Sequence, residues 1–106
     1  MNRWKIPIEL ENEIRKRDIF CVYCNVMLDE KVSKGNSRKN AATWEHIIND
    51  ATIINFDNIA RCCSACNSSK GTKKLADWIK SEYCKKNNIN INTVAPIIKK
   101  ALEILN

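Results

Sequence analysis

The sequence predicts an α+β fold, because segments typical of strands and segments typical of helices occupy different parts of the chain. Residues 43–48 and 58–62, near the middle, contain residues that favour strands, whereas helical periodicity dominates both ends. Two C-x2-C pairs flank this central segment. The 106 residues suit a single domain over residues 1–106, whose small core favours an additional cross-link.

A first helix is expected from Pro7 to about Arg17. Pro7 suits a helix start, and Ile8, Leu10 and Ile14 recur among charged residues at helical spacing. The acidic residues of this segment come first and the basic residues last, which is the order that the helix dipole favours. The sequence therefore predicts an amphipathic first helix.

Two paired strands are expected in the centre of the chain. Residues 43–48 favour the first strand, and residues 53–55 together with 58–62 can supply its partner after an Asn-Asp turn. Upstream, residues 29–40 are polar and show no periodicity, so we expect a flexible loop there.

Three helical segments are expected after Cys63. A short helix should follow this residue and end near Gly71, and Thr72 resembles the N-cap of a second helix. The apolar residues that share a face of this second helix are Leu75, Trp78, Ile79 and Tyr83. The last segment has the clearest helical spacing, at Val94, Ile97, Ile98, Ala101, Leu102 and Leu105. Its apolar face needs a partner, either the first helix or another copy of the protein.

The six cysteines predict a metal site rather than disulfide bonds. No apolar run approaches the ~20 residues that span a bilayer, and the N-terminus lacks a signal-peptide core, so we expect a cytoplasmic protein without membrane contact. In a reducing compartment, two matched C-x2-C pairs indicate one structural Zn²⁺. Its ligands are expected to be Cys21, Cys24, Cys63 and Cys66. Cys62 and Cys84 are expected to be buried thiols, with Cys62 replacing Cys63 as the weaker alternative.

The charge balance favours an anionic partner. The chain carries 18 basic and 12 acidic residues, a formal net charge of +6, and nucleic acid is the first candidate for a basic protein of this size. Two stretches without acidic residues lie on either side of Glu45 and His46. Their basic residues are Lys31, Lys34, Arg38 and Lys39 in the first stretch and Arg61, Lys70, Lys73 and Lys74 in the second. A basic surface that serves only solubility is the alternative.

His46 is the only histidine of the chain. A histidine at this place can be a zinc ligand, a core residue or a general base. Four cysteines already complete a tetrahedron, which argues against a zinc ligand. An ordinary histidine pKa of ~6.5 suits proton transfer near neutral pH. The residues alone leave the roles of base and core residue open.

The central segment carries an ordered pattern. It reads Glu45-His46, Asn58-Ile59, Cys63-Ser64-Ala65-Cys66-Asn67 and Lys70-Gly71. This order resembles the HNH endonucleases, and the stretch from Arg17 to Cys24 resembles the zinc knuckle that precedes the motif in many members. The resemblance covers roughly residues 17–78. It implies a small zinc-linked ββα-metal core with flanking N- and C-terminal helices.

The resemblance also implies a role for each residue of the motif. His46 would activate water as the general base, and Asn58 would fix the loop of the hairpin and so orient His46. Glu45 and Asn67 would bind a catalytic Mg²⁺ or Mn²⁺, which prefer hard oxygen ligands. Because successive residues of a strand face opposite sides, Glu45 and His46 meet at one site only where the strand end twists. Asn67 and Asn49 depart from the commoner His and Pro at these positions.

The implied activity is metal-dependent hydrolysis of phosphodiester bonds in double-stranded DNA, as in restriction, phage DNA processing or intron mobility. The residues expected to contact phosphates are Lys34, Arg38, Lys70, Lys73 and Lys74. One chain offers one site, so a double-strand break requires a homodimer or two successive nicks. A zinc-ribbon module that only binds nucleic acid would explain the charge and the cysteines equally well. An RNA-cleaving nuclease of the same fold would use the same residues.

Overall fold

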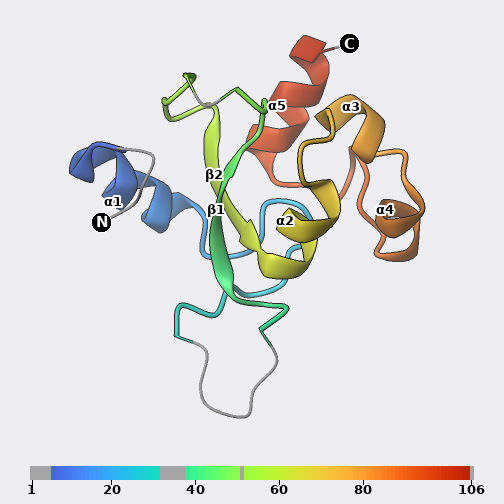
Figure 1. Ribbon diagram of the computed structural model, residues 1–106, viewed down its shortest axis with the longest axis horizontal. Coiled ribbons are helices and arrows are strands. Elements are labelled where there is room, and N and C mark those ends of the chain that lie inside the picture. The colour runs from blue at the N-terminus through green and yellow to red at the C-terminus, as the bar shows by residue number, and fades with distance from the viewer. Residues whose placement is uncertain (1–5, 32–37, 51, 106) are drawn as a thin grey trace.

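The computed structural model describes residues 6–31, 38–50 and 52–105, and within these ranges it contains one two-stranded sheet and five helices (Figure 1). The elements in chain order are α1 (Ile8–Arg17), β1 (Ala42–His46), β2 (Ile59–Cys63), α2 (Ser64–Lys70), α3 (Leu75–Trp78), α4 (Glu82–Lys86) and α5 (Pro96–Leu105). Figure 1 shows α1 on one side of the hairpin and the remaining helices on the other. The expected α+β class is therefore confirmed.

The first helix forms where its periodicity predicts it, as α1. The side chain of Ile14 is fully buried and belongs to a small apolar cluster with Ile6 and Ile59, against which Trp44 packs. Just after the helix, the buried carboxylate of Asp18 accepts a hydrogen bond from the backbone N–H of Arg61 at 3.0 Å. These contacts attach α1 to the outer face of the hairpin.

The hairpin is antiparallel but shorter than its composition suggests. Trp44 lies opposite Arg61, and His46 lies opposite Ile59 at the end of the ladder. Residues 53–55 do not join the second strand and belong to the loop instead. The strands stop here because the side chain of Asn58 bonds backbone groups of Ile48 and Ile53, which a longer ladder would pair with each other or with a neighbouring strand.

The helix expected after Thr72 is interrupted and forms two short helices. Lys74, rather than Thr72, precedes α3, which ends at Trp78. The side chain of Ser81 accepts a hydrogen bond from the backbone N–H of Cys84 at 3.3 Å and so caps a new helix, α4. Upstream, α2 ends at Lys70 and is followed, as expected, by Gly71, whose φ of 51° is accessible to glycine without strain.

The last helix closes the main core. Ile98 and Leu102 of α5 pack in one apolar cluster with Leu75 and Trp78 of α3 and with Val22. The partner of this apolar face is thus α3 and its neighbours rather than α1. Among the described residues, no helix combines the length and apolarity that crossing a bilayer requires.

Candidate functional site

The two C-x2-C pairs come together at the start of α2. The sulfur atoms of Cys21, Cys24, Cys63 and Cys66 all lie within 4.8 Å of one another. A tetrahedral zinc site with Zn–S bonds of ~2.3 Å has sulfur-to-sulfur separations of roughly 3.8 Å. The Sγ atoms of Cys24 and Cys63, one from each pair, lie 3.7 Å apart. The cluster therefore has dimensions that can hold a metal ion and are compatible with zinc.

Both pairs are shaped by tight backbone turns. The backbone N–H of Cys24 points to the sulfur of Cys21 at 3.5 Å, and the N–H of Cys66 points to the sulfur of Cys63 at 3.4 Å. After the first pair, Asn25 adopts a φ of 68°, a conformation that asparagine tolerates better than most residues. N–H groups directed at sulfur stabilise thiolate ligands, so the turns prepare the cluster for a cation.

The protons of the cluster are unequally shared. Hydrogen bonds with the neighbouring cysteines hold the pKa of Cys24 far below its usual value; the bond with Cys21 has the largest effect, followed by those with Cys63 and Cys66. The same kind of contact, again with Cys21 first, raises the pKa of Cys66. Because a metal-binding thiol must lose its proton, a dication that binds here releases the protons that remain.

The other two cysteines stay outside the cluster. Cys62 and Cys84 are both buried free thiols, and burial raises the pKa of each. The sulfur of Cys62 lies 3.5 Å from the hydroxyl group of Thr43, which is opposite it in the ladder. Because successive residues of a strand face opposite sides, Cys62 points away from the side that Cys63 faces. Cys63, rather than Cys62, is therefore the member of the cluster.

His46 is the last residue of β1 and is 8% exposed. Burial lowers the pKa of its imidazole, and the nearby charges of Glu45 and Asp50 oppose that shift. Its backbone carbonyl accepts a hydrogen bond from the Nζ of Lys70 at 3.5 Å. The neutral imidazole that results at neutral pH can accept a proton.

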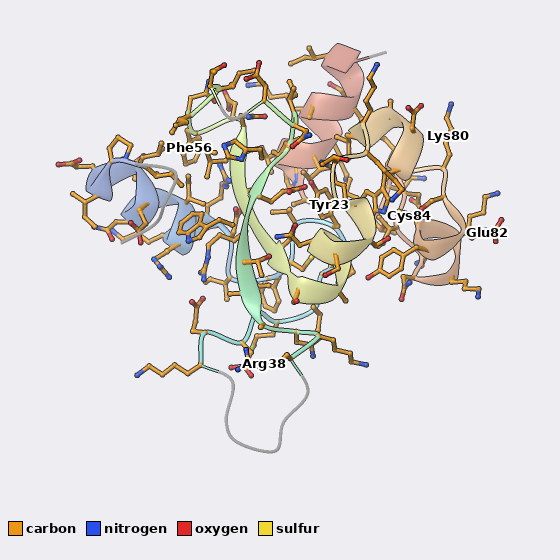
Figure 2. All side chains as sticks on the ribbon, in the orientation of Figure 1. Tyr23, Arg38, Phe56, Lys80, Glu82 and Cys84 are labelled. Carbon is orange, nitrogen blue, oxygen red and sulfur yellow. The ribbon has the colours of Figure 1, made fainter. Side chains whose placement is uncertain are left out.

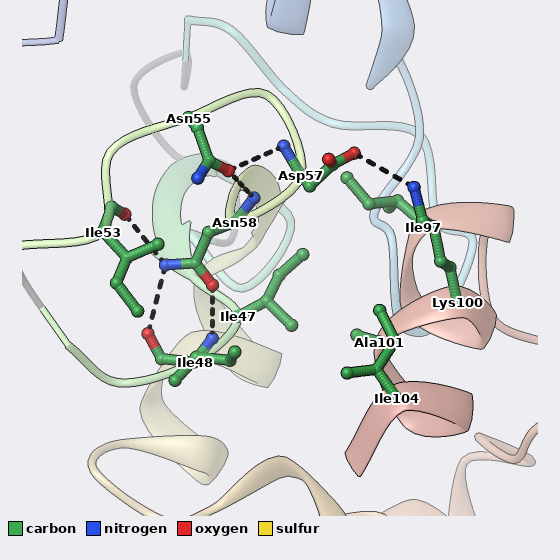
Figure 3. A pocket seen from close by; sticks show the side chains of 10 residues that line it. All are labelled: Ile47, Ile48, Ile53, Asn55, Asp57, Asn58, Ile97, Lys100, Ala101 and Ile104. Atoms are coloured by element: carbon green, nitrogen blue, oxygen red, sulfur yellow. Dashed lines mark hydrogen bonds and ion pairs between the residues drawn. The ribbon is translucent and has the colours of Figure 1, made fainter.

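The loop that follows His46 is held by Asn58 (Figure 3). The Oδ1 of Asn58 accepts a hydrogen bond from the backbone N–H of Ile48 at 2.7 Å, and its Nδ2 donates to the carbonyls of Ile48 and Ile53 at 3.3 and 2.9 Å. Asn58 itself is 3% exposed, and its backbone N–H is bound by the side chain of Asn55. One side chain thus ties both ends of the loop together directly beside His46.

Glu45 belongs to a buried polar cluster. Its Oε2 accepts a hydrogen bond from the hydroxyl group of Tyr23 at 2.8 Å and forms an ion pair with the Nζ of Lys70 at 3.0 Å. Tyr23 and Lys70 are fully buried, and Glu45 is 5% exposed. Both charges lie on the face of β1 that α2 covers, so they are withdrawn from bulk water.

This arrangement corrects the expectation for Lys70. Its position after the motif suggested a phosphate contact, but its ammonium group is enclosed and paired with Glu45. Lys70 follows Cys66 by four residues on α2, and residues four apart lie on the same face of a helix. Because Cys66 faces the buried cysteine cluster, Lys70 also faces the interior.

Asn67 connects α2 to the first strand. Its Nδ2 donates to the hydroxyl oxygen of Thr43 at 2.9 Å and to the backbone carbonyl of Trp44 at 3.2 Å. These contacts use the nitrogen of the amide and leave Oδ1 as its remaining polar atom. Asn67 and Glu45 therefore both lie between α2 and β1.

The expected phosphate-binding residues do not form one surface. Arg38 is exposed but lies before the Ala42 end of β1, at the opposite end of the hairpin from the loop that carries Phe56 (Figure 2). Lys34 lies outside the described residues. Arg61 of the second stretch without acidic residues, which was not expected to contact phosphate, is 4% exposed and forms an ion pair with Glu30.

Lys73 and Lys74, which follow α2, do reach the surface. Both are exposed, and Lys74 lines a groove of about 550 Å³ that is formed by residues 47–49, Thr72 and residues 74–76. Residues 47–49 directly follow His46. The groove therefore joins an exposed lysine to the loop beside the histidine.

The ion pair between Glu45 and Lys70 predicts a specific pattern of stability. Replacing Lys70 with methionine should lower the free energy of unfolding by about 3–5 kcal/mol, because it leaves a carboxylate buried without its counter-ion. The double variant Glu45→Gln with Lys70→Met should recover most of this loss, since neither charge then remains. Chemical denaturation of both single variants and the double variant measures the coupling. Additive losses would show that the two side chains do not interact.

The sequence matches no known family model, and neither the curated proteins nor the solved structures include a significant match to it. The class of the protein therefore follows from its own fold and site. It is a small α+β protein with four clustered cysteines that can hold a metal ion, compatible with zinc.

Proposed function

We propose that the protein is a metal-dependent endonuclease that hydrolyses phosphodiester bonds in DNA. The observation that carries this proposal is the position of His46 at the end of β1, next to Glu45 and beside a loop held by Asn58. The hairpin leads through a C-x2-C pair into α2, which returns Asn67 to the first strand. These residues stand in the order of the HNH endonucleases, and the elements follow in the order that a ββα core requires.

His46 serves as the general base in this proposal. Its imidazole accepts the proton of a water molecule whose oxygen attacks phosphorus. The bond from phosphorus to the 3′ oxygen breaks, and that oxygen takes up a proton from solvent. The products are a 5′-phosphate and a 3′-hydroxyl group. A base that is neutral at working pH and held in a fixed orientation suits this step. Asn58 maintains the orientation through the three hydrogen bonds that hold the loop.

The ligands proposed for a divalent ion are the remaining oxygens of Glu45 and Asn67. The contacts of Glu45 described here use Oε2, and those of Asn67 use Nδ2, so Oε1 and Oδ1 remain for a hard cation. A bound Mg²⁺ or Mn²⁺ would supply positive charge that stabilises the departing oxygen. Because Lys70 already neutralises Glu45, we expect weak ion binding until a substrate phosphate adds further oxygen ligands.

Incubation with supercoiled plasmid DNA, with and without Mg²⁺, tests the proposal. The expected result is nicked or linear DNA in the presence of Mg²⁺ alone, with 5′-phosphate and 3′-hydroxyl ends. A parallel incubation with RNA identifies a nuclease of the other substrate class. Tight DNA binding without any cleavage, by protein that contains zinc, would refute the nuclease and favour a zinc module that only binds nucleic acid.

Lys73 and Lys74 are proposed to contact the phosphates of the substrate. Replacing both with glutamine should weaken binding to all sequences alike, because phosphate contacts carry no sequence information. The slope of log K against log salt should become less steep by roughly 1.8, at about 0.9 per lost contact. The matched control replaces Lys85 and Lys86, two exposed lysines of α4, with glutamine. Equal changes in slope for the two pairs would indicate a general charge effect without a defined contact.

A further inference from the structure

Tyr23 links the cysteine cluster to the candidate active site. It lies inside the first C-x2-C pair, between Cys21 and Cys24, and its side chain is fully buried. Its hydroxyl group nevertheless reaches the first strand and donates to the Oε2 of Glu45 at 2.8 Å. A residue of the turn that shapes the cluster therefore contacts the residue next to His46.

Further contacts hold the ring of Tyr23. Its ring packs edge-on against Trp78 with the ring centres 4.8 Å apart, and Trp78 in turn donates a hydrogen bond to the Oγ of Ser69 on α2 at 2.9 Å. Figure 2 shows Tyr23 in the interior, beside α2. Burial raises the pKa of Tyr23 well above its usual range, and the negative charge of Glu45 adds to this effect.

Glu45 is held from two directions. Tyr23 approaches its Oε2 from the first cysteine pair, and Lys70 approaches the same oxygen from α2, which carries Cys66 of the second pair. The Nζ of Lys70 also reaches the backbone carbonyl of His46 at 3.5 Å. The end of β1 is thus fixed by Tyr23, from the turn of the first cysteine pair, and by Lys70, from the helix that carries Cys66.

We propose that Tyr23 is a positioning residue of the candidate site, whose hydroxyl group fixes the Glu45 carboxylate so that its other oxygen is available to a divalent cation. This inference rests on the proposed function. Groups that hydrogen-bond a metal-binding carboxylate fix its orientation, and their loss typically weakens metal affinity 10–100-fold. Tyr23 thereby couples the structural cysteine cluster to the place where the catalytic ion would bind.

Tyr23→Phe isolates this contact, because phenylalanine keeps the ring and removes only the donor. The probe is Mn²⁺ alone, followed by the broadening of the imidazole NMR signals, which are unambiguous because His46 is the only histidine. The matched control is Tyr83→Phe. Tyr83 stacks on Trp78 from another direction, and its hydroxyl group lies 3.4 Å from the sulfur of Cys66. Zinc content and thermal unfolding are measured for both variants.

The expected result is an Mn²⁺ midpoint at least 10-fold higher for Tyr23→Phe, with wild-type zinc content and with Tyr83→Phe near wild type. Equal midpoints for Tyr23→Phe and the wild type, or equal weakening in both variants, would overturn the inference. If the inference fails in this way but the wild-type protein cleaves DNA, the proposed function still holds. A wild type that neither binds Mn²⁺ nor cleaves overturns both.

A second measurement does not require the Tyr23→Phe variant. The chain has two tyrosines, so fluorotyrosine labelling gives two fluorine signals, which the Tyr83→Phe variant assigns. Addition of Mg²⁺ to the labelled protein should shift the signal of Tyr23 and leave that of Tyr83 in place. A Tyr23 signal that does not respond, while the His46 signals do, would show that the hydroxyl group takes no part in holding the ion.

Discussion

Replacing Cys21 with serine is expected to unfold the protein rather than to weaken it slightly. The four cysteines join a turn near residue 21 to the start of α2, and the segment between them includes the whole hairpin. A structural zinc ion contributes on the order of 10 kcal/mol to the folding of small metal-binding domains, which is comparable to the whole stability of a domain of this size. Circular dichroism and elemental analysis of the purified variant measure folding and zinc content.

The matched control for this prediction is Cys84→Ala. Cys84 is also a buried cysteine, but it lies outside the cluster. Its replacement should leave one zinc ion per chain and lower stability only by the small cost of a cavity. Zinc chelation of the wild type should reproduce the effect of Cys21→Ser. A Cys21→Ser protein that stays folded without zinc would show that the cluster does not hold a structural ion.

The spacing of the cysteines was the most informative signal in the sequence. Two matched pairs predict one shared site because each C-x2-C turn can direct two sulfurs to one point, and the structure brings all four together. The 3.6-residue period of apolar residues was equally informative, and both α1 and α5 form where it predicted a helix. These features depend on local geometry, which a sequence records directly.

Contacts between elements were less accessible. The burial of Lys70 depends on how α2 lies against β1, although its spacing of four from Cys66 already places both residues on one face. The break between α3 and α4 depends on one cap at Ser81, whose effect outweighs the apolar periodicity across it. The contact from Tyr23 to Glu45 joins residues 22 positions apart and leaves no periodic signal.

Several of the buried polar groups lie near the end of β1, where His46 is the last residue. Glu45, Lys70 and Tyr23 lie on the α2 face of the hairpin, and Asn58 lies at its loop end, directly before β2. Buried polar groups cost stability unless they are paired, and these groups pair chiefly with one another or with the backbone near His46. Because these paired groups surround one histidine, substitution of His46 is the most informative test of the proposed activity.

His46→Ala is therefore expected to lower the rate of DNA cleavage by roughly 10²–10⁴, which is the usual contribution of a positioned general base. Zinc content and DNA affinity should stay near wild type, because the cysteine cluster and the exposed Lys73 and Lys74 are unchanged. The measurement combines plasmid cleavage in Mg²⁺, DNA binding, zinc content and thermal unfolding on one protein.

A conservative control separates catalysis from packing. Glutamine fills much of the same volume as histidine and keeps an amide that can hydrogen-bond, but it cannot act as a base near neutral pH. If His46 is the base, His46→Gln should lose as much activity as His46→Ala while it retains more stability. If His46 only fills its buried position, activity should instead follow the folded fraction, and glutamine should restore it. A His46→Ala protein that cleaves DNA at the wild-type rate would refute the assignment of the general base.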